Sequence, residues 1–155
     1  AAMDTWYQGG TEIVFACGGG IYTSAAEAAA KVGGKLIGVD SDQAPVIDAY
    51  GEGMTITSAM KGLAPTVNTL LSAIVLEGTW DQYVGKIDNL GLVSENPEDN
   101  YVQLPLESTQ WCDTFTEDDY RALVASMVAG DITVDNNTET MPETAITVND
   151  LGNIK

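Results

Sequence analysis

The sequence predicts an α/β fold, with a mainly parallel β-sheet flanked by helices. Residues 12–17 and 35–40 are short apolar runs with β-branched side chains, which is typical of buried strands. The alanine-rich stretch between them, residues 24–32, has the composition of a helix. A strand, a helix and a second strand form a βαβ unit, which requires parallel strands and a right-handed crossover.

The first elements follow from this unit. Residues 1–9 have the character of the last turns of a helix that precedes the first strand. Ser24 and Glu27 have the spacing of a capping box, so we expect the second helix to begin at Ser24. Gly33 and Gly34 supply its stop, immediately before the second strand.

A third strand is predicted at residues 54–60, after a short polar connection at residues 41–53. Pro65 marks the start of the next helix, and Gly78 marks its end. We expect the apolar stripe of this helix to pack in the core. The stripe consists of Val67, Leu70, Leu71, Ile74 and Val75.

The next segment predicts a hairpin at an edge of the sheet. Residues 83–93 form a further strand region, residues 96–100 have the composition of a turn, and residues 101–106 can return antiparallel. The hairpin is therefore expected to add an antiparallel edge to the parallel sheet.

The last predicted helix is amphipathic and has clear signals at both ends. Thr116 with Asp119 predicts its N-terminal cap, and Gly130 predicts its end. In the tail, short strands are expected at residues 132–134 and 145–148.

Composition excludes several classes of function. The 155 residues fit a single domain, and 23 acidic against six basic residues give a net charge of −17. This charge repels nucleic acid and anionic membrane surfaces. The chain has no histidine, which excludes serine–histidine and cysteine–histidine catalysis. Cys17 and Cys112 lie in dissimilar contexts and imply no disulfide or metal framework, so we expect a buried Cys17 and a free thiol at Cys112. No cofactor is expected.

The candidate site lies where the predicted parallel strands end, because ligands of open α/β sheets bind at that edge. Gly19 and Gly20 follow the first strand and let a ligand approach the backbone closely. Asp40 and Asp42 follow the second strand, and a carboxylate there can accept two hydrogen bonds from a diol. Together these residues suit a sugar or a ribose.

Lys61 ends the third strand, where its ammonium group can donate a hydrogen bond to a ligand oxygen or to Asp40. Tyr22 is the best-placed aromatic residue, immediately after the glycine loop. Trp6 and Trp80 lie near helix ends and are expected to cover the core.

Two other interpretations of these residues stay open. In a purely structural one, the glycines make a tight turn and Asp40 or Asp42 caps a loop. In a dinucleotide-binding one, Gly18-x-Gly20 and Asp40 imitate the phosphate-loop and ribose-binding residues of a Rossmann domain, although Thr23 replaces the third glycine.

Four segments resemble, in order and spacing, the second half of the basic membrane protein (BMP) family of solute-binding lipoproteins. They are residues 14–20, 27–29, 37–43 and 57–61. The hexapeptide Gly38-Val39-Asp40-Ser41-Asp42-Gln43 is the most specific of the matching elements. The resemblance covers roughly the first two-thirds of the chain, and residues 101–155 form a less family-like C-terminal extension.

The resemblance implies a type I periplasmic-binding-protein-like fold with two lobes. Residues 1–155 would then be a single α/β C-terminal lobe, three-layered and Rossmann-like, excised from a longer protein. The family works outside the cytoplasm as the receptor of an ABC importer, often for purine nucleosides. It contacts a transporter permease, and it is tethered to the plasma membrane, or held in the periplasm, through a lipid anchor absent from this chain.

Carried over by position, Gly19, Gly20 and Asp40 would hold ribose hydroxyls, and Lys61 would add a polar contact. The family commonly has Thr-Gly after the two glycines, whereas Ile21-Tyr22 stands here. The resemblance thus implies a non-catalytic receptor for a nucleoside or a related ribose-containing solute. The alternatives are a dinucleotide-dependent enzyme domain and a ligand-sensing or interaction domain that has lost the pocket.

Overall fold

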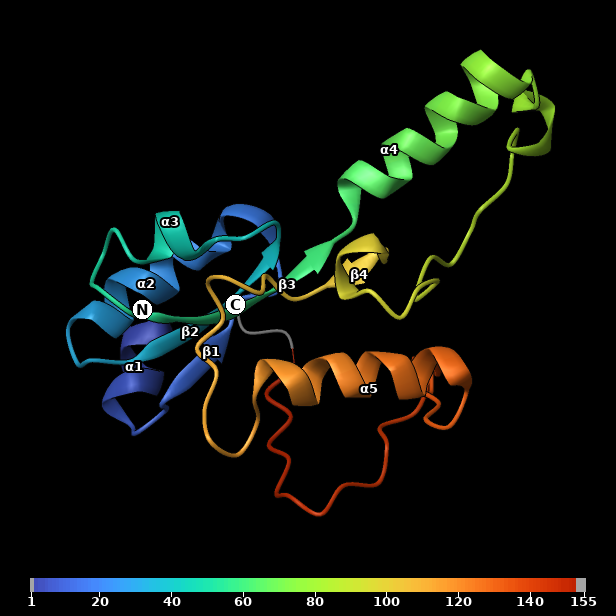
Figure 1. Cartoon of the computed structure of the whole chain (residues 1–155). Coiled ribbons are helices and arrows are strands. Elements are labelled where there is room, and N and C mark those ends of the chain that lie inside the picture. The colour runs from blue at the N-terminus through green and yellow to red at the C-terminus, as the bar shows by residue number, and fades with distance from the viewer. Residues whose placement is uncertain (1, 153–155) are drawn as a thin grey trace.

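The computed structural model describes residues 2–152 and has an α/β fold, as the sequence predicts. Its open sheet has the strand order β1-β2-β3-β4. The strands β1 (Ile13–Phe15), β2 (Lys35–Asp40) and β3 (Thr55–Lys61) are parallel, and β4 (Val102–Gln103) is antiparallel to β3. Helices α2 and α3 cover one face, and α5 lies toward the other, giving a Rossmann-like three-layer lobe (Figure 1).

The βαβ unit forms where the sequence predicts it. Helix α1 (Ala2–Gln8) precedes β1, and α2 (Tyr22–Ala30) connects β1 to β2. The buried face of α2 consists of alanines, whose small side chains let the helix approach the sheet closely. Gly33 follows with a φ of 73°, a conformation that glycine adopts without steric cost.

The capping box expected at Ser24 and Glu27 is wrong, because Ser24 lies inside α2. A single 3-10 turn, η1 (Gly19–Ile21), closes directly after β1 and continues into α2. The N–H of Ile21 donates to the carbonyl of Gly18, so the chain is already helical three residues before Ser24.

The connection after β2 contains a short helix that the sequence analysis did not predict, α3 (Ala44–Ile47). Ile47 is fully buried against the core. After α3, the Asp48 carboxylate accepts hydrogen bonds from the backbone N–H of Thr55 at 2.8 Å and from its hydroxyl at 2.7 Å. These bonds fix the start of β3.

The hairpin expected from residues 83–93 and 101–106 is wrong. Residues 83–93 contain no strand and are mostly exposed, because glycines and charged residues interrupt their apolar pattern. The turn at residues 96–100 is confirmed by a 3-10 turn, η4 (Pro97–Asp99). The following strand, β4, does form an antiparallel edge, but it pairs with the end of β3.

At the C-terminus, α5 (Glu117–Ala129) has the predicted ends. Thr116 and Asp119 form a reciprocal capping box, and Gly130 ends the helix with a φ of 84°. The strands expected at residues 132–134 and 145–148 are wrong, because both segments are irregular and exposed.

The helix after β3 is also placed differently from the expectation. Helix α4 (Leu63–Leu71) continues as a π-helical stretch, η2 (Ser72–Glu77), and ends at Gly78 as predicted. Together α4 and η2 form an arm that projects away from the sheet (Figure 1). No residue of α4 is buried, so the expectation that its apolar stripe packs in the core is wrong.

The core instead lies between the sheet and helices α1, α2 and α3. Trp6 packs against it as expected, whereas the side chain of Trp80 is 49% exposed, which contradicts its predicted position over the core. None of the helices between residues 2 and 152 combines the length and apolar character that a bilayer crossing requires.

Candidate functional site

Asp40 and Lys61 lie together at the carboxyl edge of the sheet, as the sequence predicts. Asp40 is the last residue of β2, and Lys61 is the last residue of the neighbouring parallel strand β3. The Lys61 Nζ lies 2.8 Å from the Asp40 Oδ1, and both side chains are accessible. Because the pair is exposed, a ligand can reach both charges.

The backbone of Asp40 adopts a conformation that side chains disfavour. Its φ is 69°, and among residues 2–152 it is the only non-glycine residue with a positive φ. Such a conformation costs on the order of 1–3 kcal/mol and is concentrated at functional sites. The strained residue therefore coincides with the carboxylate that the sequence singles out.

The electrostatics of the edge keep the ammonium group charged. The hydrogen bond and the negative charge of Asp40 raise the pKa of Lys61, and Cys17 makes a smaller electrostatic contribution in the same direction. Cys17 follows β1 and is exposed, so the expectation that it is a buried hydrophobe is wrong. The ends of all three parallel strands thus meet at this edge.

A cavity of about 280 Å³ opens beside the ion pair. Asp40, Ser41 and Lys61 line it from the sheet edge, and residues 63–65 line it from the start of α4. Glu98 and Gln103 complete its polar wall. It therefore presents carboxylates as acceptors and an ammonium group as donor, which suits a ligand rich in hydroxyl groups.

Gly19 and Gly20 lie in the turn η1, at the end of the neighbouring strand, and they do not line this cavity. A Cβ added to either glycine meets no atom within 4 Å, and neither has a positive φ. The fold itself therefore does not require glycine at these two positions. A ligand that approaches the backbone would explain their lack of side chains.

Tyr22 and Asp42 have structural contacts instead of facing the cavity. Tyr22 begins α2, and its half-buried ring packs against the core. The Asp42 carboxylate accepts a hydrogen bond from the N–H of Ala44 at 3.0 Å and one from the hydroxyl of Ser108 at 2.8 Å. Asp42 thus starts α3 and fastens a distant loop to the sheet edge.

Gln43 is a residue whose role the sequence analysis missed. Its Oε1 accepts a hydrogen bond from the N–H of Val39 at 2.9 Å, and its Nε2 donates to the carbonyl of Gly19 at 3.2 Å. The hydroxyl of Ser58 accepts from the backbone N–H of Gln43 at 3.1 Å. Gln43, which is only 8% exposed, therefore ties the glycine loop to the ends of β2 and β3.

The hydrogen bonds of Gln43 also explain why the hexapeptide 38–43 begins with glycine. A Cβ at Gly38 would lie 2.6 Å from the hydroxyl of Ser58 and 2.8 Å from the Cβ of Gln43. No side chain fits there, so glycine is required at that position. The signal for Gln43 was a polar residue in the short connection that follows a buried strand, three positions after its last residue.

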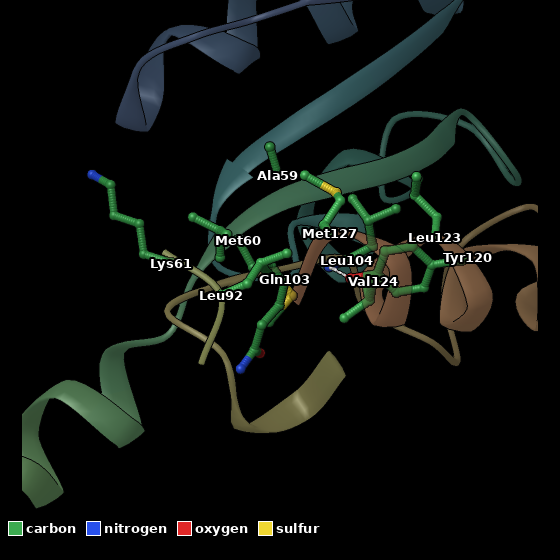
Figure 2. A pocket seen from close by; sticks show the side chains of 11 residues that line it. Ala59, Met60, Lys61, Leu92, Gln103, Leu104, Tyr120, Leu123, Val124 and Met127 are labelled. Atoms are coloured by element: carbon green, nitrogen blue, oxygen red, sulfur yellow. Dashed lines mark hydrogen bonds between the residues drawn. The ribbon is translucent and has the colours of Figure 1, made fainter. Parts of the chain in front are cut away.

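A second cavity lies between β3, β4 and α5, with a volume of about 370 Å³. Figure 2 shows Leu104, Leu123 and Val124 gathered around it, while the side chain of Lys61 points away. The hydroxyl of Tyr120 is already the acceptor for the N–H of Leu104 at 3.1 Å. Few polar groups converge on this cavity, so the carboxyl edge is the better candidate site.

Comparison with known proteins gives no further support for an assignment. No protein-family model and no curated protein matches the chain. The functional interpretation therefore depends on the geometry of the site and on the residues that compose it.

Proposed function

We propose that the chain is the ligand-binding lobe of an extracytoplasmic receptor for a nucleoside or a related ribose-containing solute. The observation that carries the proposal is the strained carboxylate of Asp40, paired with Lys61 at the mouth of an open cavity. Strain of this kind persists where the position of the side chain matters. A carboxylate at the end of a parallel strand is well placed to hold two hydroxyl groups of a ribose.

The ion pair does not prevent such binding. Exposed salt bridges contribute about 0–1 kcal/mol, so a ligand hydroxyl can take the place of one partner at little cost. Asp40 would then accept hydrogen bonds from a diol, while Lys61 would donate to another solute oxygen. Gly19 and Gly20 would let the solute approach the backbone of η1.

The transport context of the proposal comes from the sequence resemblance. The receptor would deliver its solute to the permease of an ABC importer, held near the membrane by a lipid anchor, and would catalyse no reaction. A single lobe supplies one wall of such a binding cleft, so the isolated chain is expected to bind weakly.

The test is a titration of the purified chain with adenosine, followed by two-dimensional amide NMR. Asp40→Asn keeps the shape and the tolerance of a positive φ, but it removes the charge. We expect adenosine to shift the amides of residues 38–43 in the wild type, and we expect at least about tenfold weaker binding in Asp40→Asn. Asp118→Asn, which changes an exposed carboxylate on α5, serves as the matched control and should bind normally.

Equal binding by the wild type and Asp40→Asn would contradict the assignment. A response to NAD without a response to adenosine would favour the dinucleotide-binding alternative. No response to adenosine, ribose or NAD would favour a domain whose pocket has been lost.

A further inference from the structure

A third cavity lies on the arm, away from the site of the proposed function. Its volume is about 290 Å³, and it lies between α4 and the segment that returns from the arm toward β4. Figure 1 shows this segment running back from the tip of the arm. The cavity shares no lining residue with the cavity beside Asp40, so it is a separate candidate site.

Two aromatic rings form one side of this cavity. Trp80 belongs to the 3-10 turn η3 (Trp80–Gln82), and Tyr83 follows directly. Their ring centroids lie 6.4 Å apart, and the ring planes differ by 21°. Trp80 is half exposed, although its large and mainly apolar ring is of a kind that usually packs in a core. The ring is therefore available to a ligand.

Polar groups surround the aromatic rings. The Nζ of Lys86 lies 5.8 Å from the centroid of the Tyr83 ring and 3.2 Å from the Oδ1 of Asp88. The hydroxyl of Thr69, on α4, lies 3.2 Å from the hydroxyl of Tyr101, which directly precedes β4. All of these residues line the cavity. An aromatic platform is thus combined with hydroxyl groups, a carboxylate and an ammonium group.

We propose that this arm cavity binds a neutral pyranose sugar. A pyranose has an apolar C–H face that can cover an aromatic ring, and its hydroxyl groups lie around the rim of that face. Here the Trp80 ring would take the face, while Asp88 and the hydroxyl groups of Thr69 and Tyr101 would bond to the rim. These groups already pair with one another, and each hydroxyl or carboxylate oxygen keeps lone pairs with which it can accept a further hydrogen bond from the rim of a sugar.

The charge of the site also favours a neutral ligand. Lys86 and Asp88 form an ion pair, so the cavity offers no excess positive charge to an anion. The net charge of −17 further repels anions. The size of the cavity fits a single sugar ring or the terminal residue of a glycan.

The experiment measures saturation transfer by NMR from the full chain to methyl β-D-glucopyranoside and methyl β-D-galactopyranoside. We expect transfer to the ring protons of at least one glycoside. Trp80→Ala should abolish it, Trp80→Phe should retain part of it, and Asp88→Asn should weaken binding by about tenfold. Tyr50→Ala, which truncates a similarly exposed aromatic ring outside the cavity, should have no effect.

The proposal would be overturned by no transfer to either glycoside, by equal transfer in Trp80→Ala, or by loss of transfer in Tyr50→Ala. Trp80-dependent binding of adenosine without binding of the glycosides would also overturn it, because it would assign the cavity to a planar base. Amide spectra of Trp80→Ala, recorded in parallel, establish that the variant is folded. Asp40→Asn should leave glycoside binding unchanged, which separates this site from the proposed nucleoside site.

Discussion

Asp40 combines backbone strain and charge in one residue, and the two effects can be separated by substitution. Asp40→Gly and Asp40→Ala both remove the ion pair with Lys61. They differ in that glycine adopts the φ of 69° freely, whereas alanine does not. We expect the glycine variant to exceed the alanine variant in free energy of unfolding by about 1 kcal/mol, measured by urea denaturation. An alanine variant of equal or greater stability would mean that position 40 is unstrained in solution.

Other residues at the same edge show what a single sequence reveals about a site. Asp40 and Lys61 were predictable, because the ends of neighbouring parallel strands must meet. The positions of Asp42 and Gln43 were not, because their contacts depend on Ser108 and Gly19, which are distant in the sequence. The sequence pattern therefore identifies the carboxyl edge of the sheet, whereas the hydrogen-bond partners of the side chains at that edge depend on the tertiary fold.

At the scale of elements, helices α1 and α2 are joined by an ion pair that predicts a pH effect. The Nζ of Lys31 lies 2.6 Å from the Oδ1 of Asp4, and this contact contributes most to lowering the pKa of Asp4 from 3.8 to about 2. A carboxylate with a lowered pKa in the folded state stabilises the fold above the unfolded-state pKa. That stabilisation is lost as the pH falls from about 4 to about 2.

The measurement is the thermal midpoint of the wild type and of Asp4→Asn across this pH range. Other carboxylates also titrate there, so the informative quantity is the difference between the two proteins. We expect the wild type to be the more stable near pH 5, with the difference shrinking toward pH 2. A difference that stays constant with pH would contradict the predicted role of the pair.

The elements that the sequence predicts well are those with local signals. The capping residues Thr116 and Asp119 and the glycine after Ala129 define α5 without reference to the rest of the chain. The segment 83–93 lacks such signals. Helix α3 has a proline in its first turn, but its four residues are too few for a helical period to show in the sequence. For α4 the helical period was predictable, but the period indicates only that one face is apolar and not what covers it.

At the scale of the whole molecule, the main cluster of buried residues lies in the N-terminal part of the chain, and few buried apolar side chains lie beyond it. The buried core cluster extends from Tyr7 to Met54, and it lies between the sheet and helices α1 to α3. The arm formed by α4 and η2 lies outside this cluster, with Val75 71% and Leu76 80% exposed. Stability is therefore expected to be distributed unevenly along the chain.

Substitutions in the arm and in the core test this distribution. Val75→Ser and Leu76→Ser should each change the free energy of unfolding by no more than about 0.5 kcal/mol, because the side chains are already in water. Leu36→Ala, at a fully buried position of β2, should cost about 2–5 kcal/mol. Chemical denaturation of the three variants gives the comparison directly. Arm substitutions as costly as Leu36→Ala would contradict this expectation. They would mean that the apolar side chains of the arm are buried against another surface in solution.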